Sequence, residues 1–303
     1  MSRTAYLAPE GFEAQLREEL GRGIVAEHGR LLLAEGEAAP AAWAANTWFD
    51  AQEVEIGSIG DAAAKLKNIQ RNWVAYAPLH HRRAKLIVEK LPHVSAKLLN
   101  FGQPLPAAPL GSFTLLAPDR MLYAARCSSP MPHGEFAFNE DRERPPSRAY
   151  LKLWEALTRF GSMPNPGDIC LDLGASPGGW TWVLGNTGAQ VTAIDKAPLA
   201  AAVAAMRNVR WEAGSAFALD PAGFERVDWL CSDVICYPAR LLKLVQRWLA
   251  AGRVRNAICT LKFQGETDQE TARAFAAIPG SRLLHLHHNK HELTWLWSRP
   301  EKK

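Results

Sequence analysis

The most constraining feature of the chain is a glycine-rich turn between an apolar segment and a helical one. The run 168–173 is typical of a short buried strand, and a helical segment begins at Trp180. Glycines between a strand and a helix let the backbone approach a ligand at a helix N-terminus. Pro177 removes one amide donor and the spacing is not Gly-x-Gly-x-x-Gly, so a dinucleotide is less favoured. We expect these residues to border a ligand: Asp172, Gly174, Ala175, Ser176, Pro177, Gly178, Gly179 and Trp180.

The next strand-like segment, 190–195, ends in an acid. Asp195 follows Gly174 by 21 residues, a spacing at which a carboxylate accepts hydrogen bonds from the ribose of a bound nucleoside. A helix N-cap is the alternative for Asp195. The turn and the acid together suit an adenosine cofactor without pyrophosphate, and we expect S-adenosyl-L-methionine. Many methyltransferases carry an acid after the third strand to bind the adenine; Ser215 takes that place here, and its hydroxyl can accept a hydrogen bond.

Strand-like and helical segments alternate along the second half of the chain. Strands are expected at 168–173, 190–195, 209–212, 227–233, 257–262, 282–287 and 293–297, and helices from 180 and at 199–206, 239–251 and 266–278. This alternation predicts an α/β fold with a mainly parallel sheet that is covered on both faces. Residues 1–127 predict a smaller α+β domain, and the Pro- and Ser-rich segment 128–146 is interpreted as a linker to a domain at 147–303.

Charge is unevenly distributed along the chain. The chain is 48% hydrophobic and 22% charged, with a net charge of +4, which is ordinary for a globular protein. Between residues 65 and 97, however, eight basic residues accompany a single acid, Glu89. This stretch favours contact with phosphates, and a solvated helix face is the alternative. The basic residues are Lys65, Lys67, Arg71, Arg82, Arg83, Lys85, Lys90 and Lys97.

The remaining features exclude several classes of protein. The five cysteines include no Cys-x-x-Cys pair, and the histidines at 285–291 lack a fitting carboxylate or cysteine set, so we expect no metal site. No uninterrupted apolar stretch reaches the roughly 18 residues of a membrane span. The N-terminus lacks the pattern of a signal peptide. We therefore expect a cytoplasmic protein that contacts no membrane.

The glycine turn and four charged residues together resemble a known family. The run Asp172-Leu-Gly-Ala-Ser-Pro-Gly-Gly-Trp is similar to motif I of the FtsJ-type 2′-O-ribose methyltransferases, which have a Rossmann-like class I S-adenosylmethionine-dependent domain. Those enzymes carry a Lys-Asp-Lys-Glu tetrad, and this sequence has a match for each member in the same order. The matches are Lys152, Asp233, Lys262 and Glu292. The resemblance implies that they form the catalytic site for methyl transfer to a ribose 2′-hydroxyl of RNA, with Asp233 also beside the cofactor.

Within that family, 128–303 is most similar to the M-type enzymes, the 23S rRNA (cytidine-2′-O)-methyltransferases. The similarity lies in Ser129-Pro-Met-Pro-His-Gly, Pro146-Ser-Arg148, Leu151-Lys-Leu and His291-Glu-Leu-Thr. It implies 23S ribosomal RNA as the substrate, Arg148 as a further RNA-binding residue, and a THUMP-like RNA-binding region within 1–127. Residues 58–126 are short for a complete THUMP domain, but their expected order of helix, strand, helix, strand, strand fits one.

The two lysines of the tetrad set the chemistry. Holding an ordinary lysine amine neutral at pH 7 costs about 4.6 kcal/mol. A second lysine and a sulfonium lower that cost, whereas acids raise it. We expect Lys262 to steer and deprotonate the 2′-hydroxyl, Lys152 to assist, and Asp233 and Glu292 to hold the two amines. Two alternatives stay open: an S-adenosylmethionine-dependent enzyme with a protein or small-molecule substrate, and an inactive RNA-binding protein on the same fold.

Overall fold

The chain folds into two compact units, one ending at Ala137 and the other beginning at Phe138. This computed structural model describes residues 2–95 and 97–300. The segment 128–146, interpreted above as a linker, is divided between the units. Its first part packs in the N-terminal unit, where Ser128 donates its backbone N–H to the Thr47 oxygen at 2.8 Å. Its last part packs in the C-terminal unit, where Phe138 makes an edge contact with Trp154.

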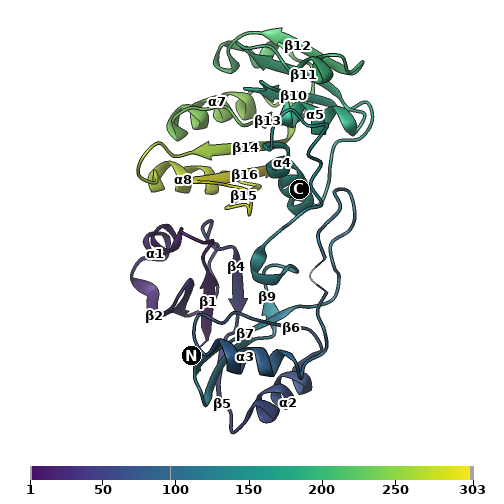
Figure 1. Cartoon of the computed structure of the whole chain (residues 1–303). Coiled ribbons are helices and arrows are strands. Elements are labelled where there is room, and N and C mark those ends of the chain that lie inside the picture. The colour runs from purple at the N-terminus through teal and green to yellow at the C-terminus, as the bar shows by residue number, and fades with distance from the viewer. Residues whose placement is uncertain (1, 96, 301–303) are drawn as a thin grey trace. The chain divides into compact units, whose positions relative to one another are not determined.

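The N-terminal unit contains two sheets (Figure 1). Its strands are β1 Arg3–Leu7, β2 Ile24–His28, β3 Leu31–Glu35, β4 Asn46–Phe49, β5 Gln52–Glu55, β6 Trp73–Ala75, β7 Gly111–Ala117, β8 Arg120–Ala124 and β9 Arg126–Cys127. Its helices are α1 Glu13–Leu20, α2 Ile59–Ile69 and α3 His81–Val88. One sheet has the order β2-β3-β1-β4-β9 and the other the order β5-β8-β7-β6. The predicted α+β character is confirmed, including the order α2, β6, α3, β7, β8.

The two sheets of this unit share apolar side chains. Leu7 and Trp48 of the first sheet form one cluster with Leu122 and Ala124 of β8. Helices α2 and α3 cover the second sheet through another cluster, which contains Leu66, Ile87 and Phe113. The polar faces of α2 and α3 therefore remain at the surface, and this is the segment with the excess of basic residues.

The C-terminal unit is built on one sheet with helices on both of its faces. Its strands are β10 Ile169–Leu173, β11 Gln190–Asp195, β12 Val209–Ala213, β13 Val227–Ser232, β14 Val254–Lys262, β15 Ser281–Leu284 and β16 Glu292–Ser298. Its helices are α4 Tyr150–Phe160, α5 Gly179–Asn186, α6 Ala201–Ala204, α7 Pro238–Ala250 and α8 Gln269–Ala276. Helix α4 contacts α5, and α7 contacts α8; Figure 1 shows these pairs on different sides of the sheet.

The strand order is β12-β11-β10-β13-β14-β16-β15. The strands from β10 to β14 pair in parallel, whereas β16 runs antiparallel between β14 and β15. Strand β13 is buried along its whole length, as expected for a central strand with helices on both faces. The predicted α/β fold with a mainly parallel sheet is confirmed. The carboxyl ends of neighbouring parallel strands meet at one edge, and ligands bind at that edge in such sheets.

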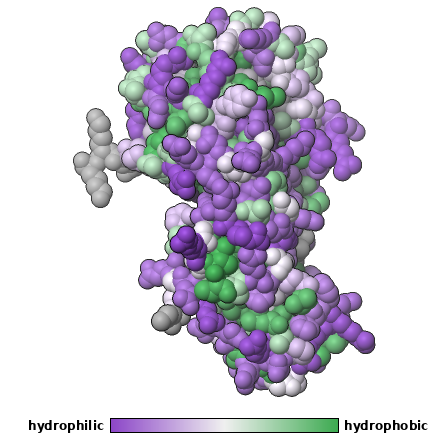
Figure 2. Space-filling model, turned by 90° about the vertical axis from the view of Figure 1, so that its left-hand side faces the viewer, coloured by the Kyte–Doolittle hydropathy of each residue, from purple (hydrophilic) through white to green (hydrophobic). Residues whose placement is uncertain are grey.

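The face of the molecule drawn in Figure 2 is mostly polar. Figure 2 shows a face on which hydrophobic side chains form small groups separated by hydrophilic ones. Among the residues that the structure describes, no helix is both long enough and apolar enough to cross a membrane. The cysteines are unpaired thiols, and all except the half-buried Cys127 are buried, as expected from their apolar surroundings in the sequence.

Candidate active site

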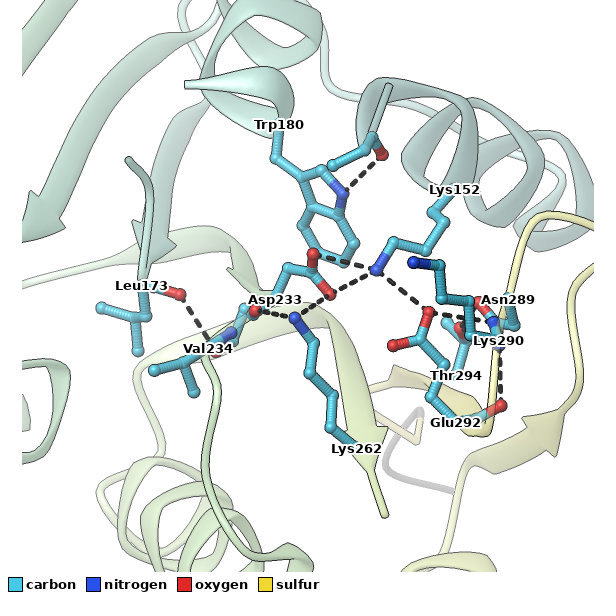
Figure 3. Close-up of polar contacts among 12 residues, drawn as sticks. Lys152, Leu173, Trp180, Asp233, Val234, Lys262, Asn289, Lys290, Glu292 and Thr294 are labelled. Atoms are coloured by element: carbon cyan, nitrogen blue, oxygen red, sulfur yellow. Dashed lines mark hydrogen bonds and ion pairs between the residues drawn. The ribbon is translucent and has the colours of Figure 1, made fainter. Parts of the chain in front are cut away.

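The four charged residues singled out in the sequence converge at one edge of the sheet (Figure 3). Lys152 lies on α4, Asp233 directly follows β13, Lys262 ends β14 and Glu292 begins β16. Strands β13 and β14 are parallel neighbours, so their carboxyl ends meet. Strand β16 is antiparallel to β14, and Glu292 stands opposite Lys262 in the register. The topology thus brings together residues that lie up to 140 positions apart.

Hydrogen bonds and ion pairs join all four side chains. The Nζ atom of Lys152 lies 2.8 and 2.9 Å from the two carboxylate oxygens of Asp233 and 3.1 Å from Oε1 of Glu292. The Nζ atom of Lys262 lies 3.2 Å from Oδ1 of Asp233 and 2.6 Å from its main-chain oxygen. Asp233 therefore stands between the two amines, whereas Oε1 of Glu292 binds the amine of Lys152 and also accepts the backbone N–H of Lys290 at 3.4 Å. The four formal charges cancel, which allows their side chains to be mostly buried.

The two lysines differ in their surroundings. Burial lowers the pKa of Lys152, but the charges of Asp233 and Glu292 and their hydrogen bonds outweigh it, so the pKa is raised above its ordinary value. Lys152 therefore remains a cation at neutral pH, held between two acids. Lys262 has one carboxylate partner and one peptide oxygen. The site thus contains one amine that is held as a cation by two carboxylates, and a second amine that contacts one carboxylate.

The glycine turn passes close to the loop that carries Asp233. Gly174 has a φ of +78°, and a Cβ atom there would lie 2.8 Å from the Cα atom of Val234. Gly178 has a φ of +109°. Gly179 begins α5, and a Cβ atom on it would lie 2.6 Å from Oγ of Ser147. These glycines are therefore required by backbone conformation and by close packing.

Asp172 lies beneath this turn and carries an incompletely satisfied carboxylate. It is 1% exposed, and its Oδ2 accepts a hydrogen bond from the Thr181 hydroxyl at 2.6 Å. Its Oδ1 is buried and has no hydrogen-bond partner among the described residues. Burial raises the pKa of Asp172 to about 7, and the charges of Asp233 and Asp195 act in the same direction. An acceptor of this kind next to a glycine turn is available to a ligand that donates hydrogen bonds.

The other residues expected to border a cofactor shape the surrounding loops. Asp195 accepts backbone N–H groups from Ser176 and Ala197, each at 3.0 Å. It does not cap a helix, because α6 begins only at Ala201. Each carboxylate oxygen can accept a second hydrogen bond, so the acid can still bind a ribose.

Ser215, Trp180 and the rest of the turn already have contacts within the protein. Oγ of Ser215 accepts the N–H of Phe217 at 3.3 Å. The indole of Trp180 donates to the Ala149 oxygen at 3.0 Å and is 3% exposed, so it packs against the start of α4. Ala175 is buried and Pro177 is exposed.

The basic residues are concentrated on α2, α3 and the segments that follow them. Lys67, Arg71, Arg82, Lys85, Lys90 and Lys97 are exposed. Two members are less available. The Lys65 amine binds Oδ2 of Asp61 at 2.7 Å and the Glu55 oxygen at 2.8 Å, and Arg83 is half-buried. Arg148 belongs to the C-terminal unit, where it is exposed and binds Glu140 at 2.7 Å.

The segment that precedes Glu292 contains supporting contacts that sequence reasoning missed. Nδ2 of the buried Asn289 donates to the main-chain oxygen of Glu292 and to the Thr294 hydroxyl, each at 3.1 Å. Glu155, on the same helix as Lys152, accepts two backbone N–H groups from this segment. A glutamate three residues after Lys152, amid apolar neighbours, was the available signal. No group of three or more potential metal ligands occurs among the described residues.

Comparisons with known proteins find a family similar to the part of the chain that carries most of this site. Residues 145–271 match the family described as FtsJ-like methyltransferase. The ribosomal RNA large subunit methyltransferase M of Halorhodospira halophila is 41% identical over 157 residues, which cover 49% of this chain and 46% of that protein. The protein of the same name from Alkalilimnicola ehrlichii is 38% identical over 168 residues, covering 51% and 46% respectively. The match thus spans about half the length of each of these curated relatives.

Solved structures resemble the chain only weakly. A fibrillarin from Aeropyrum pernix, in complex with natively bound S-adenosyl-L-methionine, superposes with a TM-score of 0.39 at 17% identity. It covers 65% of this chain and 85% of its own length, and the similarity is too low to support a conclusion about function. The family match is the stronger finding, because it covers the glycine turn and three of the four charged residues. The residues that match the FtsJ-like methyltransferase family, 145–271, include Lys152, Asp233 and Lys262.

Proposed function

We propose that the chain transfers a methyl group from S-adenosylmethionine to a ribose 2′-hydroxyl of large-subunit ribosomal RNA. The observation that carries the proposal is the joined set of Lys152, Asp233, Lys262 and Glu292 beside the glycine turn. Two relatives named ribosomal RNA large subunit methyltransferase M support the choice of RNA. Modification of ribosomal RNA fits a cytoplasmic location.

The residues around the glycine turn suit a nucleoside cofactor with a charged amino-acid end. The buried, unpartnered Oδ1 of Asp172 offers an acceptor to a donor such as an ammonium group. Asp195 offers spare acceptor capacity to ribose hydroxyls, and Ser215 offers a hydroxyl to the adenine. Bound there, S-adenosylmethionine would supply an electrophilic methyl group on a sulfonium.

The tetrad would position the 2′-hydroxyl and take its proton. Lys152 stays protonated between Asp233 and Glu292, so it would donate a hydrogen bond to the 2′-oxygen and stabilise the negative charge that develops there. Lys262 has fewer acidic contacts, so it would first release its own proton to solvent and, as a neutral amine, would then accept the proton of the 2′-hydroxyl. Asp233 holds both amines in register, so the two lysines act as one unit.

The N-terminal unit would hold the RNA. Its exposed basic residues on α2, α3 and the following segment fit phosphate contacts, and Arg148 would add one from the methyltransferase unit. The N-terminal unit would then serve as a THUMP-like RNA-binding region.

The proposal is tested with purified protein, methyl-labelled S-adenosylmethionine and large-subunit ribosomal RNA that lacks the modification. Mass spectrometry of the digested RNA should find a 2′-O-methylated nucleoside, which we expect to be cytidine. Label in a base, in protein or in a small molecule would reject the proposal. Cofactor binding without any transfer, to naked RNA or to ribosomal particles, would favour the inactive RNA-binding alternative.

A further inference from the structure

A buried acid outside the tetrad connects the two sides of the site. Glu155 lies on α4, three residues after Lys152, and its side chain is completely buried. The mechanism described above does not use it. A buried carboxylate is costly unless its oxygens are hydrogen-bonded, so its partners indicate what it does.

The partners of Glu155 belong to the segment that leads to Glu292. Its Oε1 accepts the backbone N–H of His287 at 2.9 Å, and its Oε2 accepts that of His288 at 3.3 Å. Four residues after His288 the chain reaches Glu292, whose Oε1 binds Lys152. One helix therefore supplies both the amine of the site and the anchor for the segment that delivers the acid partner of that amine.

Arg159 provides a second link between α4 and the same segment. Its Nη1 donates to Oε1 of Glu155 at 3.3 Å and to the main-chain oxygen of His285 at 3.4 Å. Burial raises the pKa of Glu155 to about 7, and the ion pair with Arg159 partly offsets this rise. An ion pair alone would not need the two backbone N–H groups. The two N–H groups belong to His287 and His288, so Glu155 binds the backbone of the segment that leads to Glu292.

We infer that Glu155 is a positioning residue: it clamps the segment 285–291 to α4 so that Glu292 meets Lys152. This inference rests on the proposed function, because it assigns Glu155 a role in that reaction. A displacement of about 1 Å in a catalytic group can reduce a rate by about a hundredfold. A clamp one turn from Lys152 would prevent such a displacement. Glu155 touches neither substrate nor cofactor in this role.

The test is the isosteric substitution Glu155→Gln, which removes one acceptor and brings an amide N–H against a backbone N–H. We expect kcat to fall about tenfold or more, with KM for RNA and affinity for S-adenosylhomocysteine within about twofold. Hydrogen exchange should accelerate at the His287 and His288 amides and not in β13. The matched control is Asp228→Asn, a buried acid at the far end of β13 that accepts the Ile169 N–H at 2.9 Å. It should lower stability without lowering kcat.

A double-mutant cycle separates positioning from simple loss of stability. If Glu155 acts through Glu292, then Glu155→Gln should have little further effect on kcat in a Glu292→Gln background. Additive effects of the two substitutions would overturn the inference, as would an unchanged kcat for Glu155→Gln. The exchange measurement and an NMR titration of the Lys152 amine require no methyl transfer. Weakened contact with Glu292 should lower the pKa of that amine in Glu155→Gln, and unaltered exchange and an unaltered Lys152 pKa would overturn the clamp even if the reaction proposed above proved wrong.

Discussion

Lys262 and Asp233 are joined twice, because the Nζ atom of Lys262 lies 2.6 Å from the main-chain oxygen of Asp233 and 3.2 Å from its Oδ1. The peptide oxygen belongs to the loop that also contacts Gly174 through Val234. The amine of Lys262 is therefore placed by backbone as well as by a carboxylate. Lys152, by contrast, is placed by side chains alone among the contacts recorded for its amine.

The first prediction concerns Lys262. Removal of its amine by Lys262→Ala should lower the methyl-transfer rate by about 10²–10⁴-fold, the usual range for loss of a general base. Binding of S-adenosylhomocysteine, measured by calorimetry, should be retained. Lys243→Ala on α7 is the control, because that lysine is exposed and outside the site. A variant that keeps near wild-type turnover would remove Lys262 from the mechanism.

The second prediction concerns Lys152 and high pH. The folded pKa of Lys152 is raised, so its charged form contributes stability that is present below the unfolded pKa of about 10.4. That contribution is lost as pH rises through the folded pKa. Lys152→Met should therefore be less stable than wild type at pH 8 in urea unfolding, because it leaves Glu292 without its buried partner. The difference in the free energy of unfolding between wild type and Lys152→Met should become smaller above about pH 10.4. A difference that does not change with pH would contradict the prediction.

The tetrad was predicted from the resemblance to the FtsJ-type family, and the order of the strands explains why its members meet. Asp233 follows β13 and Lys262 ends β14, and parallel strands bring their carboxyl ends to one edge. The apolar neighbours of Glu155 indicate that it is buried, but its hydrogen-bond partners lie 132 and 133 positions away. Local sequence does not encode that contact.

For the basic stretch 65–97, part of the outcome could be predicted from local sequence. The sequence predicts phosphate contacts for all eight basic residues, although Asp61 stands four residues before Lys65, the spacing at which helical ion pairs form. The sequence therefore held the signal that one member was already paired. The half-burial of Arg83, by contrast, follows from how α3 packs and could not be read from charge alone.

The third prediction concerns Asp172. Its folded pKa is raised to about 7, so the folded state retains a proton that the unfolded chain releases. Stability from this group is highest at low pH and falls as pH rises from about 4 to 7, by at most about 4 kcal/mol. Asp172→Asn should thus stabilise the ligand-free protein at pH 8 and show little difference at pH 4. It should also weaken S-adenosylhomocysteine binding at least about tenfold, because a carboxylate oxygen is lost.

Asp172→Asn should raise stability at pH 8 and weaken S-adenosylhomocysteine binding, so the test can distinguish these effects from general disruption of the turn. Thermal unfolding at several pH values measures the first, and calorimetry measures the second. Weakened binding that accompanies lower stability at pH 8 would indicate simple disruption of the turn and would contradict the assignment of Asp172.

The fourth prediction concerns RNA affinity and salt. Lys67 is exposed, whereas the amine of Lys65 binds Asp61 and the Glu55 oxygen. Lys67→Ala should weaken RNA binding and lower the slope of log K against log salt by about 0.7–0.9, the value for one phosphate contact. Lys65→Ala is the matched control on the same helix and should change the slope much less. Equal slopes for both variants would place the RNA elsewhere.

The fifth prediction separates the two constraints on Gly174. Gly174 and Gly161 have similar φ values, +78° and +85°, but a Cβ atom on Gly174 would lie 2.8 Å from the Cα atom of Val234, whereas one on Gly161 meets nothing within 4 Å. Gly161→Ala should therefore cost only the backbone strain, about 1–2 kcal/mol. Gly174→Ala adds the collision with the Val234 backbone, about 1–3 kcal/mol more. Because Val234 adjoins Asp233, methyl transfer should fall in Gly174→Ala and not in Gly161→Ala; equal losses of stability and activity would mean that the close approach of the two loops does not matter.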